Sequence, residues 1–302
     1  MVLAVTGATG FLGRTLLDRA ARGAVAVRAL ARQPQPDRPG VSWFAGDLAN
    51  RKALTRLAQG AEAMIHCAAL THARDPAQFA LANVTGTLNA IEAAVAAGVP
   101  RFILVSSLSA REPSLSAYGA SKARAERLVM ASGLDWTIVR PPGIYGPRDR
   151  DFLELFKAAR LGVVPVPRAG RASLIHADDL AALLLALVPG GEAVTAHSFE
   201  PDDGKPQGWS HGELARAIGW AVGRRPAVLP LSPAMMRTAA RADRALRGNR
   251  ARLTLDRVGY MSHPDWVVNP ARRPPAALWH ARIATRAGLK ATAEWYRENR
   301  WL

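Results

Sequence analysis

The sequence predicts an α/β protein with a doubly wound parallel sheet and a smaller mixed α/β lobe. Three observations predict this class: strand-like and helix-like segments alternate through residues 1–146, glycines directly follow the first strand-like run, and the alternation breaks after residue 146. Such alternation is typical of right-handed βαβ units, whose strands pair in parallel. The 302 residues suffice for one large core or for a core with a smaller lobe.

The strand-like runs are rich in apolar and β-branched residues, and read VLAVTG, AVAVRAL, VSWFAGD, AMIHCAA, RFILVSS and WTIVRPP. Between them, apolar residues recur at helical intervals, which predicts helices at Thr15–Arg22, Lys52–Gln59, Val84–Ala97 and Ala117–Ser132. Gly98 and Pro100 follow the third of these helices in the order that commonly ends a helix.

We expect residues 1–146 to form the first domain, with 172–190 returning to it. Residues 147–171 and 191–302 would form the second lobe, which we interpret as substrate-binding because its loops carry specificity in such proteins. Its apolar periodicity predicts helices at Gly212–Val222, Pro233–Leu246, Ala276–Thr285 and Lys290–Asn299. Ser232 and Pro233 suit the cap and first turn of the second of these helices.

Composition narrows the class of protein. With 49% hydrophobic and 21% charged residues, the chain has the balance of a globular protein. A single cysteine, Cys67, excludes an internal disulfide and a cysteine-based zinc site, and we predict no metal site because no His/Cys/Asp cluster has ligand spacing. We expect a cytoplasmic protein without a transmembrane segment, because the N-terminus reads as a strand and no apolar run reaches about 18 residues.

The net charge of +16 raises the question of an anionic partner. Basic residues are spread over both halves, without like-charged blocks or interleaved aromatic residues, so we expect no nucleic-acid partner. An anionic cofactor or small-molecule substrate fits this charge. Arg237, Arg241 and Arg244 line one side of the predicted 233–246 helix. We interpret that side as solvated rather than as a peripheral membrane contact, because the helix's apolar side is mostly alanine.

The glycine-rich turn after the first strand predicts a dinucleotide site. Gly7, Gly10 and Gly13 stand between an apolar strand and a helix. Glycine there permits the tight turn, the approach of a pyrophosphate to the backbone, and close helix–strand contact. The free N–H groups and the dipole of the helix N-terminus then favour the phosphates.

This turn and the motifs after it resemble the short-chain dehydrogenase/reductase superfamily, specifically its extended, epimerase/dehydratase-like branch. The motifs stand in the family's order, as GDL at 46–48, HCAA at 66–69, NVTGT at 83–87, VSS at 105–107, YGASK at 118–122, RPPGIYGP at 140–147 and IHADDLA at 175–181. The resemblance implies a Rossmann-type domain and an NAD(P)-dependent oxidoreductase or epimerase/dehydratase. The cofactor-binding residues that it implies are Gly7, Thr9, Gly10, Phe11, Leu12, Gly13, Arg32, Asp47, Leu48, Ala68, Ala69, Tyr118, Lys122, Pro141 and Ile144.

Tyr118 and Lys122 lie four residues apart and so share one face of a helix. A phenol with a pKa near 10 is a poor acid–base group at neutral pH, and a neighbouring ammonium lowers that pKa. The resemblance implies that Ser107 orients the substrate oxygen, that Tyr118 exchanges its proton, and that Lys122 also holds the nicotinamide ribose. It places Asn83 beside these catalytic residues, while Ser106 and Ser109 remain alternatives to Ser107.

The second strand ends at Ala31-Arg32, with no acid at its tip. An acid there would bind the ribose hydroxyls of NAD, whereas an arginine attracts the 2′-phosphate of NADP. We therefore predict NADP rather than NAD, with a plain surface role for Arg32 as the alternative. Arg28, inside the strand, is expected to pack or to be solvated.

The leading hypothesis is an NADP-dependent oxidoreductase that transfers hydride between nicotinamide and a ketone or secondary alcohol. One alternative is an NAD-dependent sugar-nucleotide epimerase or dehydratase. Relatives of that kind usually carry an arginine where Ala172 stands, with Arg171 one residue off, which weakens this alternative. Another is a catalytically silent NADP-binding sensor or accessory subunit. His176 and Asp178 are expected to tie the lobes together, and a homodimer is compatible with the resemblance.

Overall fold

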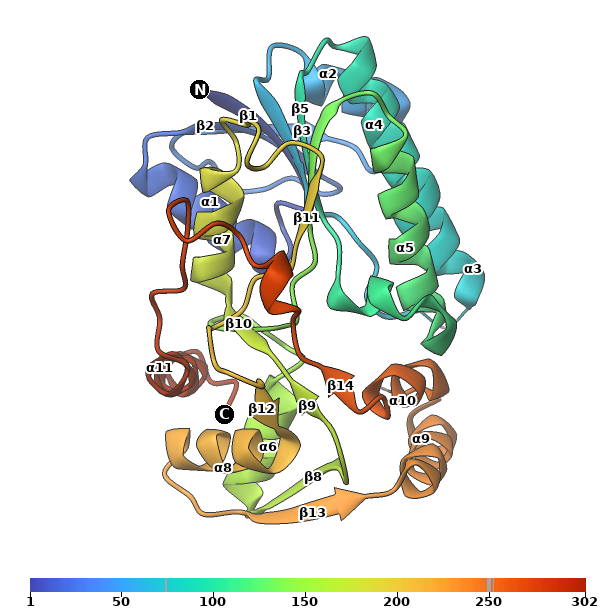
Figure 1. Ribbon diagram of the computed structural model, residues 1–302, viewed down its shortest axis with the longest axis vertical. Coiled ribbons are helices and arrows are strands. Elements are labelled where there is room, and N and C mark those ends of the chain that lie inside the picture. The colour runs from blue at the N-terminus through green and yellow to red at the C-terminus, as the bar shows by residue number, and fades with distance from the viewer. Residues whose placement is uncertain (74, 249–250, 252) are drawn as a thin grey trace. The chain divides into compact units, whose positions relative to one another are not determined.

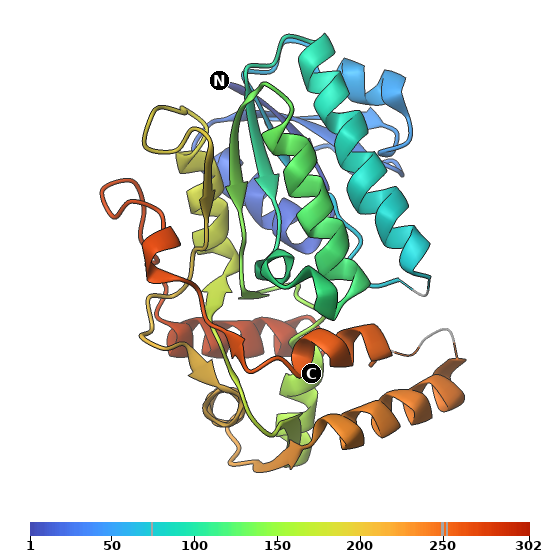
Figure 2. The ribbon, with the colours of Figure 1, turned by 45° about the vertical axis from the view of Figure 1, so that its right-hand side comes forward.

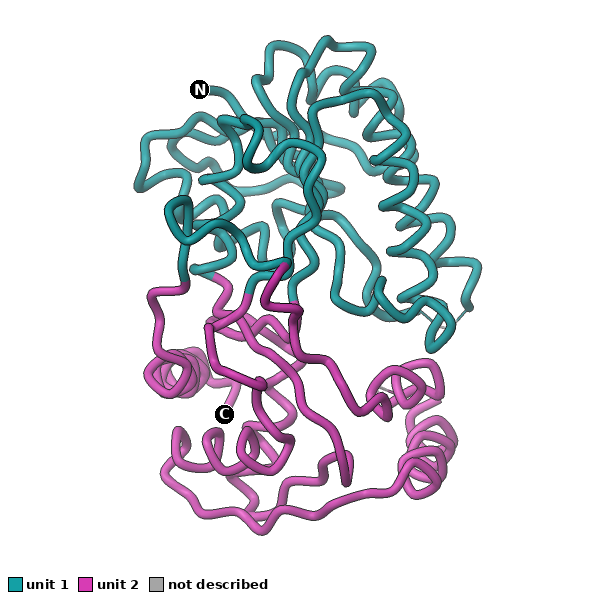
Figure 3. Tube along the Cα trace, in the orientation of Figure 1, with its two compact units in different colours: residues 1–141, 178–201, 272–280 teal, residues 142–177, 202–271, 281–302 magenta. Residues whose placement is uncertain are grey.

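The computed structural model describes residues 1–73, 75–248, 251 and 253–302, which divide into two compact units. Unit 1 comprises Met1–Pro141, Asp178–Pro201 and Arg272–His280 (Figure 3). Unit 2 comprises Pro142–Ala177, Asp202–Ala271 and Ala281–Leu302. Unit 1 thus ends at Pro141, where the sequence suggested 146, and residues 178–201 return to it, where 172–190 were expected. The substrate-binding role of unit 2 stays a prediction.

A seven-stranded parallel sheet forms the centre of unit 1, in the order β11-β6-β5-β4-β1-β2-β3 (Figure 1). Its strands are β1 (Val2–Thr6), β2 (Ala26–Ala31), β3 (Val41–Ala45), β4 (Ala63–His66), β5 (Arg101–Val105), β6 (Asp135–Val139) and β11 (His197–Phe199). The strand order changes direction between β1 and β4, which is where doubly wound sheets bind ligands beyond the carboxyl ends of their strands. The predicted fold class is confirmed.

Helices cover both faces of this sheet, with α1 (Phe11–Arg22) and α7 (Ala177–Ala186) on one face (Figures 1 and 2). The other face carries α2 (Arg51–Ala58), α4 (Gly86–Ala96) and α5 (Ala117–Met130), which enclose an apolar core. Asp178 in α7 accepts hydrogen bonds from Arg19 and Arg22 in α1, both at 2.6 Å. Asp178 therefore ties two helices of unit 1 to each other.

One helical run, 76–96, is long and apolar enough by length and composition to cross a membrane. It consists of α3 (Pro76–Phe79), a π-helical turn η1 (Ala80–Thr85) and α4, and half of its most apolar window is buried. Ala90, Ile91 and Ala94 of α4 lie in the core of unit 1. Core helices pass the same test, so the expectation that no segment spans a membrane stays a prediction.

In its described residues, unit 2 combines three small sheets with helices, which confirms the mixed α/β lobe. The strands pair as β7 (Gly143–Tyr145) with β10 (Leu174–His176), β8 (Val163–Pro167) with β13 (Ala227–Leu231), and β9 (Arg171–Ala172) with both β12 (Trp209–Ser210) and β14 (Asp265–Trp266). The helices are α6 (Leu153–Leu161), α8 (His211–Ala221), α9 (Pro233–Arg247), α10 (Leu255–Met261) and α11 (Thr285–Glu298). Ser232 caps α9 as expected, since its side chain accepts a hydrogen bond from the Met235 N–H.

The helix expected at Ala276–Thr285 is wrong. The N–H groups of Leu278 and Trp279 both donate to the Pro275 carbonyl in a single turn that does not continue. The Trp279 indole N–H donates to the Asp179 carbonyl at 3.0 Å. This tertiary hydrogen bond outweighs the apolar periodicity of the segment, and α11 begins only at Thr285.

Candidate active site

Gly7, Gly10 and Gly13 form a turn after β1, here called the glycine cradle. At residues 7 and 13 the neighbouring backbone leaves no room for a side chain. Gly7 has φ +72°, and a Cβ there would lie 2.6 Å from the Ala68 nitrogen. A Cβ on Gly13 would lie 2.1 Å from the Gly7 carbonyl oxygen. Gly10 caps α1 and is exposed, so the N-terminus of this helix stays open to solvent. Backbone that is this bare at a helix N-terminus fits the pyrophosphate of a dinucleotide.

Other predicted cofactor residues follow neighbouring strands at the same sheet edge, since all these strands run in parallel. Asp47 follows β3, and its carboxylate accepts hydrogen bonds from the N–H groups of Ala49 and Asn50. The Leu48 carbonyl accepts a hydrogen bond from the Asn89 side chain at 2.8 Å. Ala68 follows β4 and lies against Gly7. The structure therefore brings these glycine, aspartate and alanine positions to one edge of unit 1.

Arg32 lies exposed, one residue beyond β2. Among the described residues it forms no hydrogen bond or ion pair, so its guanidinium is available to a ligand. Arg28 differs: it donates to the carbonyls of Leu57 and Arg56 at the end of α2 and lies 4.4 Å from the Phe44 ring centroid. The expected packing role of Arg28 is confirmed.

The start of α5 lies against the segment that carries the candidate serines. Ser116 caps α5 by accepting a hydrogen bond from the Gly119 N–H at 2.9 Å. A Cβ on Gly119 would lie 2.7 Å from the Ser109 carbonyl oxygen, so glycine allows this close approach. Ser107 caps the short 3-10 helix Leu108–Arg111, and its Oγ accepts hydrogen bonds from the Ser109 N–H and hydroxyl. The Ser107 segment and the Tyr118 turn are therefore direct neighbours.

Ser106 is bound elsewhere. Its hydroxyl donates to Glu126 at 2.5 Å, inside unit 1. Glu126 also accepts two hydrogen bonds from the Arg140 guanidinium, at 2.9 and 2.6 Å. Sequence reasoning missed Glu126 and Arg140, although Glu126 stands four residues after Lys122, where the two side chains share a helix face.

Lys122 is buried, with 2% of its surface exposed, and its Nζ donates to the Val105 carbonyl at 2.8 Å. Burial lowers the pKa of Lys122 to about 8, while the negative charge of Glu126 opposes this shift. The lysine therefore titrates close to neutral pH. Burial raises the pKa of Cys67 to about 12, which leaves its thiol protonated and unreactive at neutral pH.

Asn83 lies in the π-helical turn η1, an irregularity that is frequent at functional sites. Its side chain accepts from the Leu70 N–H at 2.7 Å and donates to the Leu70 carbonyl and to the Ser121 hydroxyl. Ser121 in turn donates to the Tyr118 carbonyl at 2.7 Å. Asn83 and Ser121, a residue that sequence reasoning missed, thus link the loop after β4 to the first turn of α5.

The chain is similar in sequence to known proteins. Residues 7–188 match the NAD(P)H-binding family model. Over its whole length the chain is 39% identical to the ceramide reductase of Caulobacter vibrioides, and the alignment covers 96% of that protein. The chain belongs to the extended short-chain dehydrogenase/reductase family.

Two further members of this extended family show its range. The human sterol-4-alpha-carboxylate 3-dehydrogenase is 32% identical over 52% of this chain and 48% of its own length. The solved structure of MoeE5 in complex with UDP-glucuronic acid and NAD aligns with a TM-score of 0.77 at 26% identity, over 99% of both chains. The protein is accordingly an NAD(P)-dependent enzyme with a Rossmann fold.

The remaining positions singled out in the sequence lie at the end of unit 1 or in unit 2. Pro141 ends unit 1, where its carbonyl accepts a hydrogen bond from the Leu108 N–H. Ile144 belongs to β7 of unit 2, beside Ile175 of β10. His176, also in unit 2, makes an edge contact with the ring of Tyr145. In the described ranges, no group of three or more His, Cys, Asp or Glu side chains is arranged to hold a metal ion.

Proposed function

We propose that this enzyme is an NADP-dependent reductase that converts a ketone on a ceramide-like lipid to a secondary alcohol. The observation that carries the proposal is the 39% identity to a ceramide reductase, which extends through both units rather than through the cofactor domain alone. The direction of reduction is consistent with NADP, which Arg32 and the missing acid at the tip of β2 favour.

In this proposal the chain's own residues bind the carbonyl oxygen and supply its proton. NADPH, held by the glycine cradle and Arg32, would supply the hydride. Ser107 donates a hydrogen bond to the oxygen, and Tyr118 transfers its phenolic proton to that oxygen as the alcohol forms. Lys122, close to its titration point, stabilises the resulting phenolate. Ser107 is preferred over Ser106, whose hydroxyl already donates to Glu126.

A sugar-nucleotide epimerase is the competing function, and the contacts of Arg171 argue against it. The Arg171 guanidinium donates to the carbonyls of Gln207 and Gly208, and it lies 3.4 Å from Glu213. These bonds hold the arginine within unit 2. Ala172, which stands where sugar-nucleotide enzymes carry their phosphate-binding arginine, offers no charge.

The proposal is tested by incubating the purified enzyme with NADPH and a long-chain ketone of the ceramide type, and measuring the alcohol by mass spectrometry. One mole of NADPH consumed per mole of alcohol is expected, with activity lost in Tyr118→Phe. UDP-sugar epimerisation without net cofactor consumption would overturn the reductase.

A separate titration tests the cofactor. Nicotinamide fluorescence is followed with NADPH and with NADH, for wild type and for Arg32→Ala. We expect NADPH to bind more tightly in wild type and to lose this preference in the variant, because the guanidinium would no longer meet the 2′-phosphate. NADH binding that is tighter and indifferent to Arg32 would refute the NADP assignment.

A further inference from the structure

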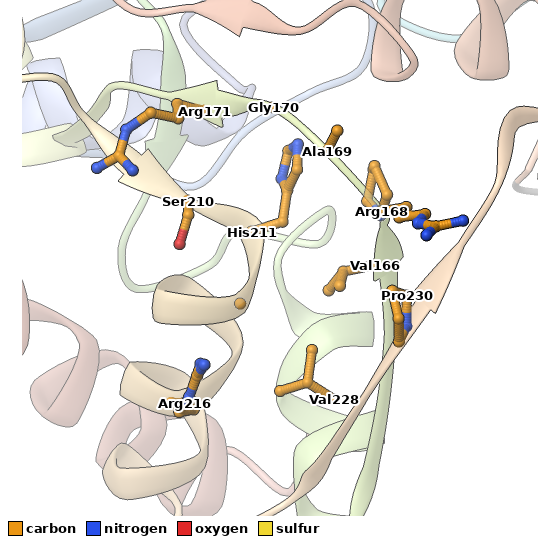
Figure 4. A pocket seen from close by; sticks show the side chains of 12 residues that line it. Val166, Arg168, Ala169, Gly170, Arg171, Ser210, His211, Arg216, Val228 and Pro230 are labelled. Atoms are coloured by element: carbon orange, nitrogen blue, oxygen red, sulfur yellow. The ribbon is translucent and has the colours of Figure 1, made fainter.

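Unit 2 contains a basic pocket in which no residue proposed for the cofactor or the proton relay takes part. The pocket measures about 570 Å³ and lies between the end of β8, strand β13 and the first turns of α8 (Figure 4). Its charged lining consists of Arg168, Arg171 and Arg216, and no lining residue carries a carboxylate. A concave surface with one sign of charge concentrates ions of the opposite sign.

The three arginines are not equivalent. Arg171 is bound to the Gln207 and Gly208 carbonyls. Arg168 and Arg216 are exposed and, in the parts of the chain that the structure describes, their guanidiniums form no hydrogen bond or ion pair. Figure 4 shows them rising from different elements, Arg168 at the end of β8 and Arg216 within α8. Two free guanidiniums therefore border one pocket.

The first turn of α8 adds donors to the same place. In a capping box, the Glu213 N–H donates to the Ser210 hydroxyl and the Ser210 N–H donates to the Glu213 carboxylate. This leaves the N–H groups of His211 and Gly212 at the mouth of the helix. The His211 ring reaches toward the Ala169–Gly170 segment (Figure 4), and its Nε2 is buried without a partner. His211 therefore lines the pocket wall, and its buried Nε2 has no surface that a ligand in the pocket could reach.

We propose that this pocket binds a phosphate group through Arg168, Arg216 and the N–H groups at the α8 N-terminus. Guanidiniums recognise phosphate oxygens through paired N–H donors, and helix N-termini favour anions. The volume exceeds what a bare ion needs, so the group belongs to a larger ester. That ester is either a soluble phosphate monoester or the headgroup of an anionic lipid, and both present the same oxygens.

The full-length enzyme is titrated with inorganic phosphate at constant ionic strength, and binding is measured by calorimetry and by the thermal unfolding midpoint. Wild type is expected to show saturable binding and a rise in the midpoint that matched chloride does not produce. Arg168→Gln and Arg216→Gln are each expected to raise the dissociation constant about tenfold, equivalent to about 1.4 kcal/mol. Arg241→Gln, an exposed arginine of α9 outside the pocket, is the matched control and should bind as wild type does.

A second arm separates the two sources of phosphate. Glycerol 3-phosphate replaces inorganic phosphate, and vesicles of phosphatidylglycerol in phosphatidylcholine are sedimented with each variant. Sedimentation that needs Arg168 and Arg216 supports a lipid headgroup, and glycerol 3-phosphate binding without sedimentation supports a soluble ester. Phosphate binding no stronger than chloride, or unchanged in both pocket variants, would overturn the site.

Discussion

Replacing Lys122 with methionine should make the protein more stable at pH 7 while abolishing its activity. The lysine is buried and its pKa is lowered by burial from 10.5 to about 8, so keeping it protonated in the folded state costs free energy. At about 1.4 kcal/mol for each pH unit, this cost is about 3 kcal/mol at pH 7. Methionine fills a similar volume but gives up the hydrogen bond to the Val105 carbonyl, worth about 1 kcal/mol. We expect a net gain of about 2 kcal/mol in the free energy of unfolding.

The sign of the pH dependence makes this prediction specific. Between pH 8 and 10.5 the unfolded chain still holds the lysine proton whereas the folded chain has released it, so wild-type stability rises with pH relative to the variant. Urea unfolding, followed by circular dichroism at pH 7 and pH 10, should show the variant's advantage at pH 7 and its loss at pH 10. Lys52→Met, at an exposed position of α2, should show no such pH-dependent difference. A Lys122→Met variant less stable than wild type at pH 7, or an advantage that does not change with pH, would refute the reasoning.

Three other predictions concern the serines, the glycine cradle and a buried acid. Ser107→Ala should lower kcat by about 10²–10³ with little loss of stability, which steady-state kinetics measures. Ser106→Ala should instead lower the free energy of unfolding by about 1–3 kcal/mol, because Glu126 loses a hydrogen-bond donor, and urea titration measures this loss. Gly13→Ala should abolish NADPH binding in a fluorescence titration, because its Cβ would lie 2.1 Å from the Gly7 carbonyl oxygen, and wild-type affinity would contradict the cradle. Burial raises the pKa of Asp149 to about 7, so wild-type stability falls as pH rises from 4 to 7. Asp149→Asn should therefore raise the urea unfolding midpoint more at pH 8 than at pH 5. An equal effect at both pH values would count against this account.

The parts of the fold that the sequence predicted correctly are those with a local cause. Strands β1–β6 and helices α1, α2, α4 and α5 of unit 1 follow from apolar periodicity, and the glycine cradle follows from steric limits that only glycine meets. Strand β11 was not predicted, because its three residues lie in a stretch that the sequence assigned to the second lobe. The sheets of unit 2 have strands as short as Arg171–Ala172, which is too short for an alternating pattern to appear. The 276–285 segment had helical periodicity, but a tertiary hydrogen bond of Trp279 decided its conformation.

In the candidate site, too, some residues could be predicted from local sequence and others could not. Tyr118 and Lys122 are predictable because four residues of helix bring them to one face. The bonds from Glu126 to Ser106 and Arg140 span 20 and 14 residues and depend on how β5, α5 and β6 pack, which no local pattern encodes. The partners of Asn83, Leu70 and Ser121, are likewise set by tertiary structure.

These unpredicted contacts explain how unit 1 accommodates a buried ammonium. Glu126 counteracts the effect of burial on the Lys122 pKa, and it is itself held by Arg140 and Ser106. Without this carboxylate the lysine would release its proton at a still lower pH and would stabilise a Tyr118 phenolate less. An apolar side chain at residue 122 would be the more stable choice, and residues that lower stability are typical of positions where activity needs a particular charge. The free-energy cost of Lys122 therefore supports the catalytic role that we propose for it, independently of the family resemblance.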